Sequence, residues 1–311
     1  GSFTLNPGVG NEITIIGLYN GNVTTSSSSY GTVNLISSFI SSIANNSGFL
    51  KMNVYDCEVT NSFQIDNGAV KGCTILGGLT ISSISSANGD TIRIMGNHIE
   101  NSLDWSSQYA YFEICNNYIE NIVNAINGIY ISGMQSNPGG TNLLSNNTIK
   151  TSGSSYSGPR GISFYNPPSG QNLVIVNNYI DVENTVYSVA YAIYSSTTMN
   201  NALVANNYYS SYYFISNFSN SSLIDNGSSS VSWTYNSTSG ILSSGTNMGL
   251  DQIEYRDINN TRNDIGTSGG PHAWSNYNTT TGKAAVFNLE LPFQLYIGGN
   301  HNIKAKGFHK N

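Results

Sequence analysis

The sequence is poor in charge, proline and cysteine. Charged residues make up 9% of the 311 residues, against roughly 25% in an average soluble protein, and there are only 7 prolines. The formal net charge is −6 and the chain has no basic stripe, so nucleic acid is not an expected partner. No apolar run approaches the roughly 20 residues that would span a bilayer, so no transmembrane segment is predicted.

The three cysteines exclude two common ways of stabilising a fold. Cys57, Cys73 and Cys115 are odd in number and lack a metal-ligand spacing, so neither a disulfide framework nor a zinc site is predicted. The chain begins with Gly1-Ser2 and has no signal-peptide pattern, so we expect that any export signal has been removed.

Gly, Ser, Asn, Thr and Tyr fill the place of the charged residues, and Tyr alone occurs 21 times. A polar composition of this kind also occurs in disordered chains. Here, however, apolar residues reach 39% and recur in short β-branched runs such as 11–15, 128–131 and 174–176. Gly, Asn, Ser or Pro bound these runs, which predicts short strands joined by turns around a buried core.

One short phrase recurs five times: Gly96-Asn97-His98-Ile99, Asn116-Asn117-Tyr118-Ile119, Asn146-Asn147-Thr148-Ile149, Asn177-Asn178-Tyr179-Ile180 and Asn206-Asn207-Tyr208-Tyr209. Its second residue falls at 97, 117, 147, 178 and 207, in steps of 20, 30, 31 and 29. Such recurrence is typical of a solenoid, in which residues one period apart lie about 4.8 Å apart. We attribute the longer steps to loops that leave the stack at 133–140 and 153–170.

The repeat predicts columns of equivalent residues. The second Asn of each phrase should form a ladder, and Cys57 and Cys73 fit the same column as small buried residues. The predicted ladder is Asn97, Asn117, Asn147, Asn178 and Asn207, and an inward aliphatic stack follows at Ile75, Ile99, Ile119, Ile149 and Ile180. Alternation then points two columns outward. They are His98, Tyr118, Thr148, Tyr179 and Tyr208, and Glu100, Glu120, Lys150, Asp181 and Ser210.

These features resemble the right-handed parallel β-helix, or pectate-lyase-like, fold. A sharper resemblance lies at Asp257-Ile258-Asn259-Asn260-Thr261-Arg262-Asn263-Asp264-Ile265-Gly266-Thr267-Ser268-Gly269-Gly270-Pro271. This segment is similar to the one that closes many secreted and surface β-helix proteins of Bacteroidota-type bacteria. It departs from the usual pattern at Asn259-Asn260, where Asp-Gly is usual, and at Thr267-Ser268, where Ala-Tyr is usual, which weakens any metal-binding role.

The predicted architecture is therefore all-β, with a right-handed parallel β-helix over 1–271 and its capping segment at about 251–271. Asp257, Arg262 and Asp264 should tie this segment by charge-assisted hydrogen bonds so that it caps the open strand edges of the solenoid end. Residues 272–311 alternate like two antiparallel strands, at 286–292 and 302–308, around Gly298-Gly299. They form either a short appendage or the start of a truncated further domain.

The best candidates for chemistry lie in the outward acidic column. Glu100, Glu120 and Lys150, continued by Asp181 and flanked by His98, could serve a polysaccharide lyase or a glycoside hydrolase. Ca²⁺ is a possible cofactor if the carboxylates bind it. The alternating signs of Glu120, Lys150 and Asp181 equally predict a structural cross-strand ladder, because the chain has only 28 charged residues and no compact acidic or Arg-rich motif before residue 257.

Tyrosine supplies the second candidate surface. Exposed tyrosine rows can stack on sugars or anchor a protein, and Tyr118, Tyr179 and Tyr208 are the expected outward row. The favoured function is a non-enzymatic extracellular or cell-surface module, adhesin-like or structural, that binds a glycan or surface protein and belongs to a larger surface assembly. The enzymatic alternative requires the Glu100 column to open into a cleft formed by the loops at 133–140 and 153–170.

Overall fold

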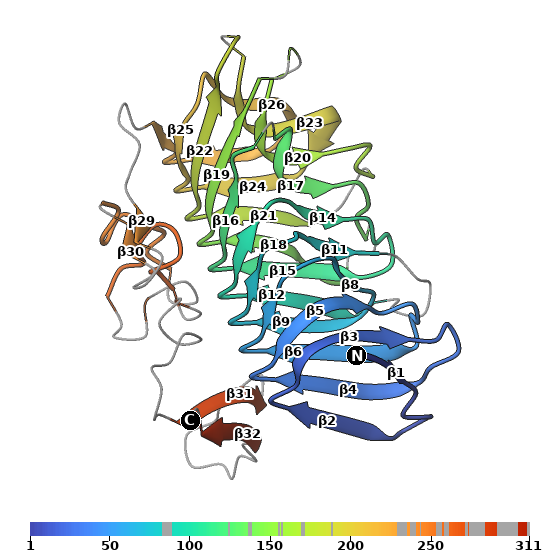
Figure 1. Cartoon of the computed structure of the whole chain (residues 1–311). Coiled ribbons are helices and arrows are strands. Elements are labelled where there is room, and N and C mark those ends of the chain that lie inside the picture. The colour runs from blue at the N-terminus through green and yellow to red at the C-terminus, as the bar shows by residue number, and fades with distance from the viewer. Residues whose placement is uncertain are drawn as a thin grey trace.

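The chain folds as a stack of β-coils (Figure 1). The computed structural model describes residues 1–82, 89–123, 125–135, 139–154, 156, 158–168, 172–187, 189–228, 235–236, 241–242, 244–252, 257, 261–270, 273, 284–290 and 304–309. For 235–236, 241–242, 284–290 and 304–309 it describes the backbone alone. The described residues include no helix, and thus none long and apolar enough to cross a membrane.

The strands of the stack form three rows, each with about one strand from every coil. Row one is a ten-stranded parallel sheet. Its strands are β2 (Glu12–Ile16), β4 (Gly31–Ile36), β6 (Leu50–Tyr55), β9 (Gly68–Lys71), β12 (Thr91–Met95), β15 (Tyr111–Cys115), β18 (Asn142–Ser145), β21 (Leu173–Val176), β24 (Ala202–Ala205) and β27 (Ser222–Ile224). Every pairing within this row is parallel, so each strand is followed by a full turn of chain before the next strand of the row.

The remaining strands of the stack form an 18-stranded parallel sheet with two rows. Row two holds β7 (Glu58–Val59), β10 (Thr74–Ile75), β13 (His98–Glu100), β16 (Tyr118–Asn121), β19 (Thr148–Gly153), β22 (Tyr179–Asn184), β25 (Tyr208–Ser210) and β28 (Gly227–Ser228). Row three holds β8 (Phe63–Ile65), β11 (Leu79–Ile81), β14 (Leu103–Trp105), β17 (Asn127–Ile131), β20 (Arg160–Phe164), β23 (Tyr191–Asn200) and β26 (Tyr213–Ser219). In the first coils β1 (Ser2–Leu5) pairs with β3 (Tyr19–Thr25), β3 with β5 (Phe39–Ala44), and β5 with both rows.

The predicted fold class is confirmed: the chain is an all-β parallel solenoid. Two antiparallel pairs complete it, β29 (Tyr235–Asn236) with β30 (Ile241–Leu242), and β31 (Ala284–Glu290) with β32 (Lys304–His309). The second pair matches the antiparallel strands expected near the C-terminus, whereas the Gly298-Gly299 turn lies outside the described residues.

One continuous apolar core runs along the inside of the coils. The predicted inward stack of Ile75, Ile99, Ile119, Ile149 and Ile180 is confirmed, since each of these side chains is fully buried. Burial of an Ile side chain contributes about 1.5–3 kcal/mol, so a stack that repeats once per coil stabilises every coil–coil interface. Larger residues such as Trp105 and Phe112, with ring centroids 5.3 Å apart, fill the wider parts of the core.

The first residue of each repeated phrase turns the chain from row one into row two. It has a positive φ at Gly96 (63°), Asn116 (56°), Asn146 (54°), Asn177 (58°) and Asn206 (51°). Gly has no Cβ to clash there, and Asn is the ordinary residue that tolerates this region best. The left-handed corner therefore explains why every phrase opens with Gly or Asn.

The second residue of each phrase joins an amide ladder. The Oδ1 of Asn147, for example, accepts hydrogen bonds from the backbone N–H of Asn117 at 3.0 Å and from its Nδ2 at 3.0 Å. The Asn147 Nδ2 in turn donates to the Ile114 carbonyl at 2.8 Å and to the Asn178 Oδ1 at 2.9 Å. The same pattern links the ladder residues Asn97, Asn117, Asn147, Asn178, Asn207 and Asn226.

The cysteines at 57 and 73 continue this ladder with thiols in place of amides. Both cysteines are free and buried. The residues that follow them, Glu58 and Thr74, are aligned between β7 and β10, so Cys57 and Cys73 occupy one column. The Cys73 thiol lies 3.6 Å from the Val54 carbonyl, which is the acceptor equivalent to Ile114 for Asn147. The backbone N–H of Cys73 donates to the Asn97 Oδ1 at 2.9 Å, so the ladder register persists across the change of residue type.

Coil length varies without disturbing these columns. Gly68 opposes Met52 only 16 residues earlier, whereas Val174 opposes Leu143, 31 residues earlier. The additional residues lie in the connections between rows two and three, at 122–126, 154–159 and 185–190, and between rows three and one, at 132–141 and 165–172.

The prediction of a single loop at 153–170 was wrong. Its middle is strand β20, which pairs in parallel with β17 and β23. The prolines at 159 and 167–168 suggested a loop, but they flank the strand at positions where the sheet requires no backbone donor.

Candidate functional site

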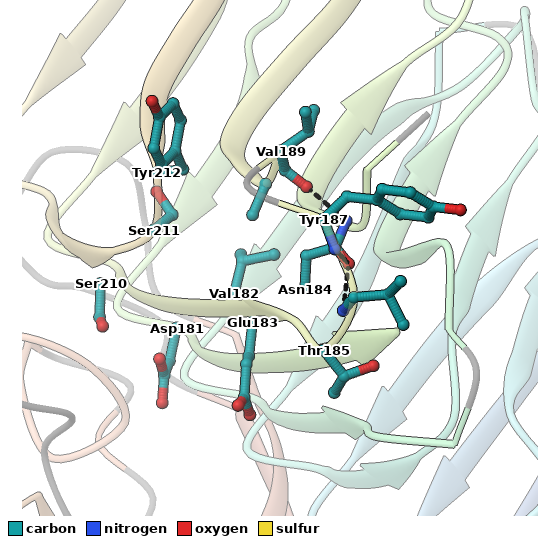
Figure 2. Close-up of a pocket in the computed structure, with 12 residues that line it drawn as sticks. Asp181, Val182, Glu183, Asn184, Thr185, Tyr187, Val189, Ser210, Ser211 and Tyr212 are labelled. Atoms are coloured by element: carbon teal, nitrogen blue, oxygen red, sulfur yellow. Dashed lines mark hydrogen bonds between the residues drawn. The ribbon is translucent and has the colours of Figure 1, made fainter. Parts of the chain in front are cut away.

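A hollow of about 720 Å³ lies at the corner between rows two and three (Figure 2). The neighbouring strands β22 and β25 and the connections that follow them supply its walls. Its described lining residues are Asp181, Val182, Glu183, Asn184, Thr185, Val186, Tyr187, Val189, Ala190, Ser210, Ser211 and Tyr212. We call it the corner hollow. Two carboxylates are the charged groups among these residues, beside polar and aromatic side chains.

A smaller hollow of about 150 Å³ continues along the same corner. It shares Asp181 and Glu183 with the corner hollow and adds Glu120, Ile122, Lys150, Thr151 and Ser152. Three acidic groups and one lysine therefore line the two hollows together. Glu120 comes from β16, Lys150 from the next strand of row two, β19, and Asp181 and Glu183 from β22, and alternation directs these side chains outward.

Asn184 fixes the shape of the corner hollow. Its Oδ1 accepts hydrogen bonds from the backbone N–H groups of Val186 at 3.1 Å and Tyr187 at 2.9 Å. Its Nδ2 donates to the Val189 carbonyl at 2.7 Å, so a single amide holds both ends of the connection (Figure 2). The Thr185 backbone N–H also donates to the Gly153 carbonyl of the preceding coil at 2.9 Å, which attaches the wall to the stack.

Two of the described lining residues of the corner hollow are tyrosines, and Figure 2 shows Tyr187 and Tyr212 on opposite sides of it. Tyr212 is 63% exposed and Tyr187 is 42% exposed, so both rings can meet a ligand. Tyr187 packs edge-on against the 82% exposed Tyr156, with ring centroids 5.3 Å apart.

A chain of rings extends from Tyr212 over the outer face of row three. Tyr212 meets Tyr213 edge-on at 4.6 Å, and Tyr213 stacks on Tyr191 at 5.0 Å. Tyr191 contacts Tyr194 at 5.3 Å, and the Arg160 guanidinium lies 3.8 Å from the centroid of the Tyr194 ring. We call Tyr156, Tyr187, Tyr191, Tyr194, Tyr212 and Tyr213 the tyrosine surface.

The residues of the acidic column predicted from the sequence are aligned on neighbouring strands, but they do not all line the same hollow. Glu100 opposes Glu120, Glu120 opposes Lys150, and Lys150 opposes Asp181, as expected. Glu120, Lys150 and Asp181 line the smaller hollow, whereas Glu100 is exposed and lines neither hollow. The enzymatic alternative requires a cleft formed by the loops at 133–140 and 153–170, and no described lining residue of either hollow comes from these loops.

His98 is the flanking histidine of that column and is half-buried. Burial lowers the pKa of its imidazole, against the opposing influence of Glu100 and Glu120. Its Nε2 is buried without a hydrogen-bond partner, and its ring centroid lies 5.0 Å from that of Tyr118. His98 is thus a largely neutral packing residue at the edge of the column.

The predicted outward row of binding tyrosines was wrong. Tyr118 is 4% exposed and Tyr179 is 0% exposed, and Tyr208 packs with Met248 against the buried pair of Tyr179 and Ile265. These rings do leave the solenoid interior, as alternation requires, but a later part of the chain covers them. Ile265 and Thr267 from that segment are both fully buried.

The covering segment, residues 244–252 and 261–270, runs alongside the corner asparagines of four successive coils, and we call it the lateral clasp. Asn116 Nδ2 donates to the Gly269 carbonyl at 2.6 Å, and Asn146 Nδ2 to the Asn263 Oδ1 at 2.6 Å. Asn177 Oδ1 accepts from the Leu250 N–H at 2.7 Å, and Asn206 Nδ2 donates to the Met248 carbonyl at 3.4 Å. Its described residues therefore bind the side of the solenoid instead of the end that was expected.

The three charged residues predicted to tie this segment do so: Arg262 and Asp264 lie in the clasp, and Asp257 bonds to it. Asp257 Oδ1 accepts from the Gly270 N–H at 2.6 Å, and Asp264 Oδ1 from the Asn247 N–H at 2.7 Å. The Arg262 Nε donates to the Gly249 carbonyl. Burial raises the pKa of Asp264, the Asn247 hydrogen bond lowers it, and Asp257 raises it further.

No cluster of three or more His, Cys, Asp or Glu side chains with a metal-binding arrangement occurs among the described residues. The carboxylates of the two hollows can accept hydrogen bonds and attract a cation.

The site and fold define a parallel β-solenoid with an acidic, tyrosine-flanked hollow on its side. Comparison of the chain with protein-family models, with curated proteins and with solved structures gave no match. The functional conclusion therefore depends on the site itself.

Proposed function

We propose that this chain is a non-enzymatic β-solenoid module of an extracellular or cell-surface protein, and that it binds a glycan at the corner hollow and the adjoining tyrosine surface. The observation that carries the proposal is the pairing of exposed Tyr187 and Tyr212 across a hollow rich in polar groups. Sugar rings have apolar faces that stack on aromatic rings and hydroxyl edges that hydrogen-bond to carboxylates, amides and hydroxyls.

The rigidity of the site supports binding by a scaffold. Asn184 and Thr185 hold the wall in place through bonds to the backbone, so a ligand need not order a loop on arrival. Binding to a preformed surface avoids part of the entropic cost of association. The resemblance of residues 257–271 to the closing segments of secreted and surface proteins supports the proposed location and a larger parent protein.

The proposal is tested by titrating the purified chain with a panel of soluble polysaccharides and oligosaccharides, with calorimetry as the readout. At least one glycan should bind, and Tyr212→Ala and Tyr187→Ala should each weaken it by roughly tenfold, because an aromatic contact contributes about 1–1.5 kcal/mol. Tyr19→Ala is the matched control, since Tyr19 is 80% exposed and lies in the first coils.

The same panel examines the enzymatic alternative. Glu120, Lys150 and Asp181 line the smaller hollow, so a lyase or hydrolase would show depolymerisation that Glu120→Gln abolishes. We expect binding without cleavage, with or without added Ca²⁺. If the chain cleaves a glycan and Glu120→Gln abolishes the cleavage, the chain is an enzyme and the proposed non-enzymatic function is wrong. If no glycan binds, the proposed glycan ligand is wrong and a protein partner should be sought.

A further inference from the structure

Seven exposed apolar or aromatic side chains lie along one corner of the solenoid. The connections between rows two and three form this corner, at 122–126, 154–159, 185–190 and 211–212. The seven side chains are 42–82% exposed, and they are Ile122, Val123, Ile126, Tyr156, Val186, Tyr187 and Tyr212. We call them the apolar ridge.

The ridge is one continuous surface, because its connections lie against neighbouring coils. The Ala125 N–H donates to the Ser152 carbonyl at 3.1 Å, and the Thr185 N–H donates to the Gly153 carbonyl at 2.9 Å. The first, second and third connections are therefore held side by side along the corner. The third and fourth connections line the corner hollow together.

The ridge contains aliphatic side chains, which the stacking of sugar rings on tyrosine does not explain. Away from the first and last coils of the stack, the exposed aliphatic residues among those described are Ile122, Val123, Ile126 and Val186. All four belong to the ridge. A contiguous apolar patch on a protein surface marks a site of contact with another protein or with lipid.

The surface that the ridge presents is uncharged. Its four connections contain no Asp, Glu, Lys or Arg. Figure 2 shows the carboxylates of Asp181 and Glu183 pointing away from the Tyr187 and Tyr212 rings, so these charges lie outside the projecting surface. The chain as a whole has a formal net charge of −6, which opposes contact with an anionic surface. The matching partner surface therefore has no net charge.

The shape of the ridge favours a lipid surface over a second copy of the chain. Its side chains project from a corner, and two corners would meet only along a line, short of the roughly 800 Å² per partner that a stable protein interface buries. A lipid headgroup layer can instead surround projecting side chains on every side. Tyrosine and aliphatic residues are also the types that lie at the boundary between headgroups and acyl chains.

We propose that the apolar ridge docks on a lipid surface without net charge, such as a phosphatidylcholine bilayer. The aliphatic side chains enter the boundary between headgroups and acyl chains, and the tyrosines lie at the level of the headgroups. Because the ridge crosses four successive coils, the axis of the solenoid lies along the surface. This inference goes beyond the proposed function, since it adds a lipid surface to the glycan.

The experiment is co-sedimentation of the purified chain with phosphatidylcholine vesicles. The chain should bind these vesicles, and added salt should leave the binding unchanged because apolar contacts are not screened. Replacing part of the phosphatidylcholine by phosphatidylserine should weaken the binding, because the chain and the surface are then both negative.

Variants on the ridge test whether its aliphatic side chains make the contact. Val123→Ser and Ile126→Ser should each weaken binding to phosphatidylcholine vesicles by roughly tenfold, because an apolar side chain no longer leaves water. Val9→Ser is the matched control and should bind as the unchanged chain does. Val9 is 79% exposed and lies between β1 and β2, whereas Val123 is 78% exposed on the ridge. Circular dichroism verifies that each variant is folded.

The outcomes separate this proposal from its alternatives. Docking on lipid is overturned if the chain does not bind phosphatidylcholine vesicles, if binding requires phosphatidylserine, or if Val123→Ser and Val9→Ser weaken it alike. If light scattering shows that the chain is a dimer, that Val123→Ser makes it a monomer and that neither binds vesicles, the ridge is an interface between two copies.

Titration with soluble glycans tests the proposed function separately. Val123 and Ile126 line neither hollow among the described residues, so Val123→Ser and Ile126→Ser should leave glycan affinity unchanged while vesicle binding falls. Glycan binding without vesicle binding would overturn the lipid docking alone. Vesicle binding without any glycan binding would overturn the proposed glycan function alone.

Discussion

At the scale of single residues, the ladder asparagines hydrogen-bond to the neighbouring coils on both sides. Asn147 is fully buried and each of its amide atoms contacts the coil before or after it. A buried polar group is tolerated only when its hydrogen bonds are made, and here each coil satisfies the groups of the next. Loss of one amide therefore leaves unpaired groups on both sides.

We expect Asn147→Ala to lower the free energy of unfolding by about 3 kcal/mol, because it removes the acceptor of the Asn117 N–H, one of the two acceptors of the Asn117 Nδ2 and a donor to the Ile114 carbonyl. Denaturant titration measures the change. Asn61→Ala is the control, since Asn61 is exposed and bonds only through Nδ2 to hydroxyl groups, and it should cost less than about 1 kcal/mol. Equal effects of the two substitutions would contradict the structural role of the ladder.

The burial of the Asp66 carboxyl leads us to expect that the free energy of unfolding depends on pH. Its carboxylate is buried and accepts a hydrogen bond from the Ser82 hydroxyl at 2.5 Å. Burial raises its pKa above the ordinary 3.8, although hydrogen bonds from Ser82 and Gln64 oppose this. A carboxyl with a raised folded-state pKa contributes stability that is complete below pH 3.8 and is lost as the pH rises through the folded-state pKa.

Asp66→Asn removes that titration while keeping an oxygen that can accept from Ser82. Unfolding free energies of the two proteins, measured from pH 3 to 7, should diverge in favour of the variant as the pH rises through this window. A difference that stays constant with pH would exclude a raised Asp66 pKa.

At the scale of elements, the lateral clasp determines which outward side chains are exposed. Tyr179 and Ile265 are both fully buried, although they lie 86 residues apart in the chain. The clasp uses the corner asparagines, whose left-handed backbone directs their amides away from the ladder. Two successive asparagines in one phrase thus serve different partners, the second holding the neighbouring coil and the first holding the clasp.

Ile265→Ala should open the clasp locally. The lost side chain and its cavity remove about 2–5 kcal/mol from a segment held by few other apolar contacts. Hydrogen exchange at the Gly266 amide, which donates to the Asn177 carbonyl at 2.8 Å, should accelerate while amides of β12 and β15 keep their protection. Ile16→Ala is the control, since Ile16 is 64% exposed, and its effect should be small. Equal acceleration along β12 and β15 would mean that the clasp and the stack unfold as one unit.

The elements also show how far sequence reasoning reaches. Columns set by a fixed local phrase were predictable, because the left-handed corner needs Gly or Asn and the next position needs a buried amide. Asn226 was missed, since its phrase Asp225-Asn226-Gly227-Ser228 has no aliphatic residue two positions on. The signal that could have found Asn226 is its spacing from Asn207. This spacing is 19 residues, the same as that between the hydrogen-bonded Asn34 and Asn53 of two earlier coils.

The candidate site was harder to predict because exposure is not a local property. Alternation correctly assigned Tyr118 and Tyr179 to the outer side of row two, but the clasp that buries them comes from far along the chain. Tyr187 and Tyr212 lie in connections, where no repeat fixes their position. A useful signal was present in row three, where Arg160, Tyr191 and Tyr213 occupy one register column.

At the scale of the whole molecule, stability comes from repeated contacts between neighbouring coils. In such a chain the free energy is close to a sum of coil terms and interface terms. A whole coil can therefore be removed if the strands on each side come back into register.

Deletion of residues 98–117 removes 20 residues, which is one full step of the ladder from Asn97 to Asn117. The remaining chain should fold, retain its β-sheet circular dichroism, and show a lower melting temperature. Deletion of residues 98–107, half of that step, should prevent cooperative folding because it moves every later strand out of its row. Folding of both variants, or of neither, would contradict the additive description.

The ladder has one further consequence for the molecule as a whole. From Asn97 to Asn226 each Oδ1 points to the preceding coil and accepts from the amide behind it, so all six amides point the same way. Strand dipoles contribute little net field in a sheet, whereas aligned side-chain dipoles add and polarise one another. The solenoid thus has an electrical axis, with its positive end towards Asn226 and its negative end towards Cys73.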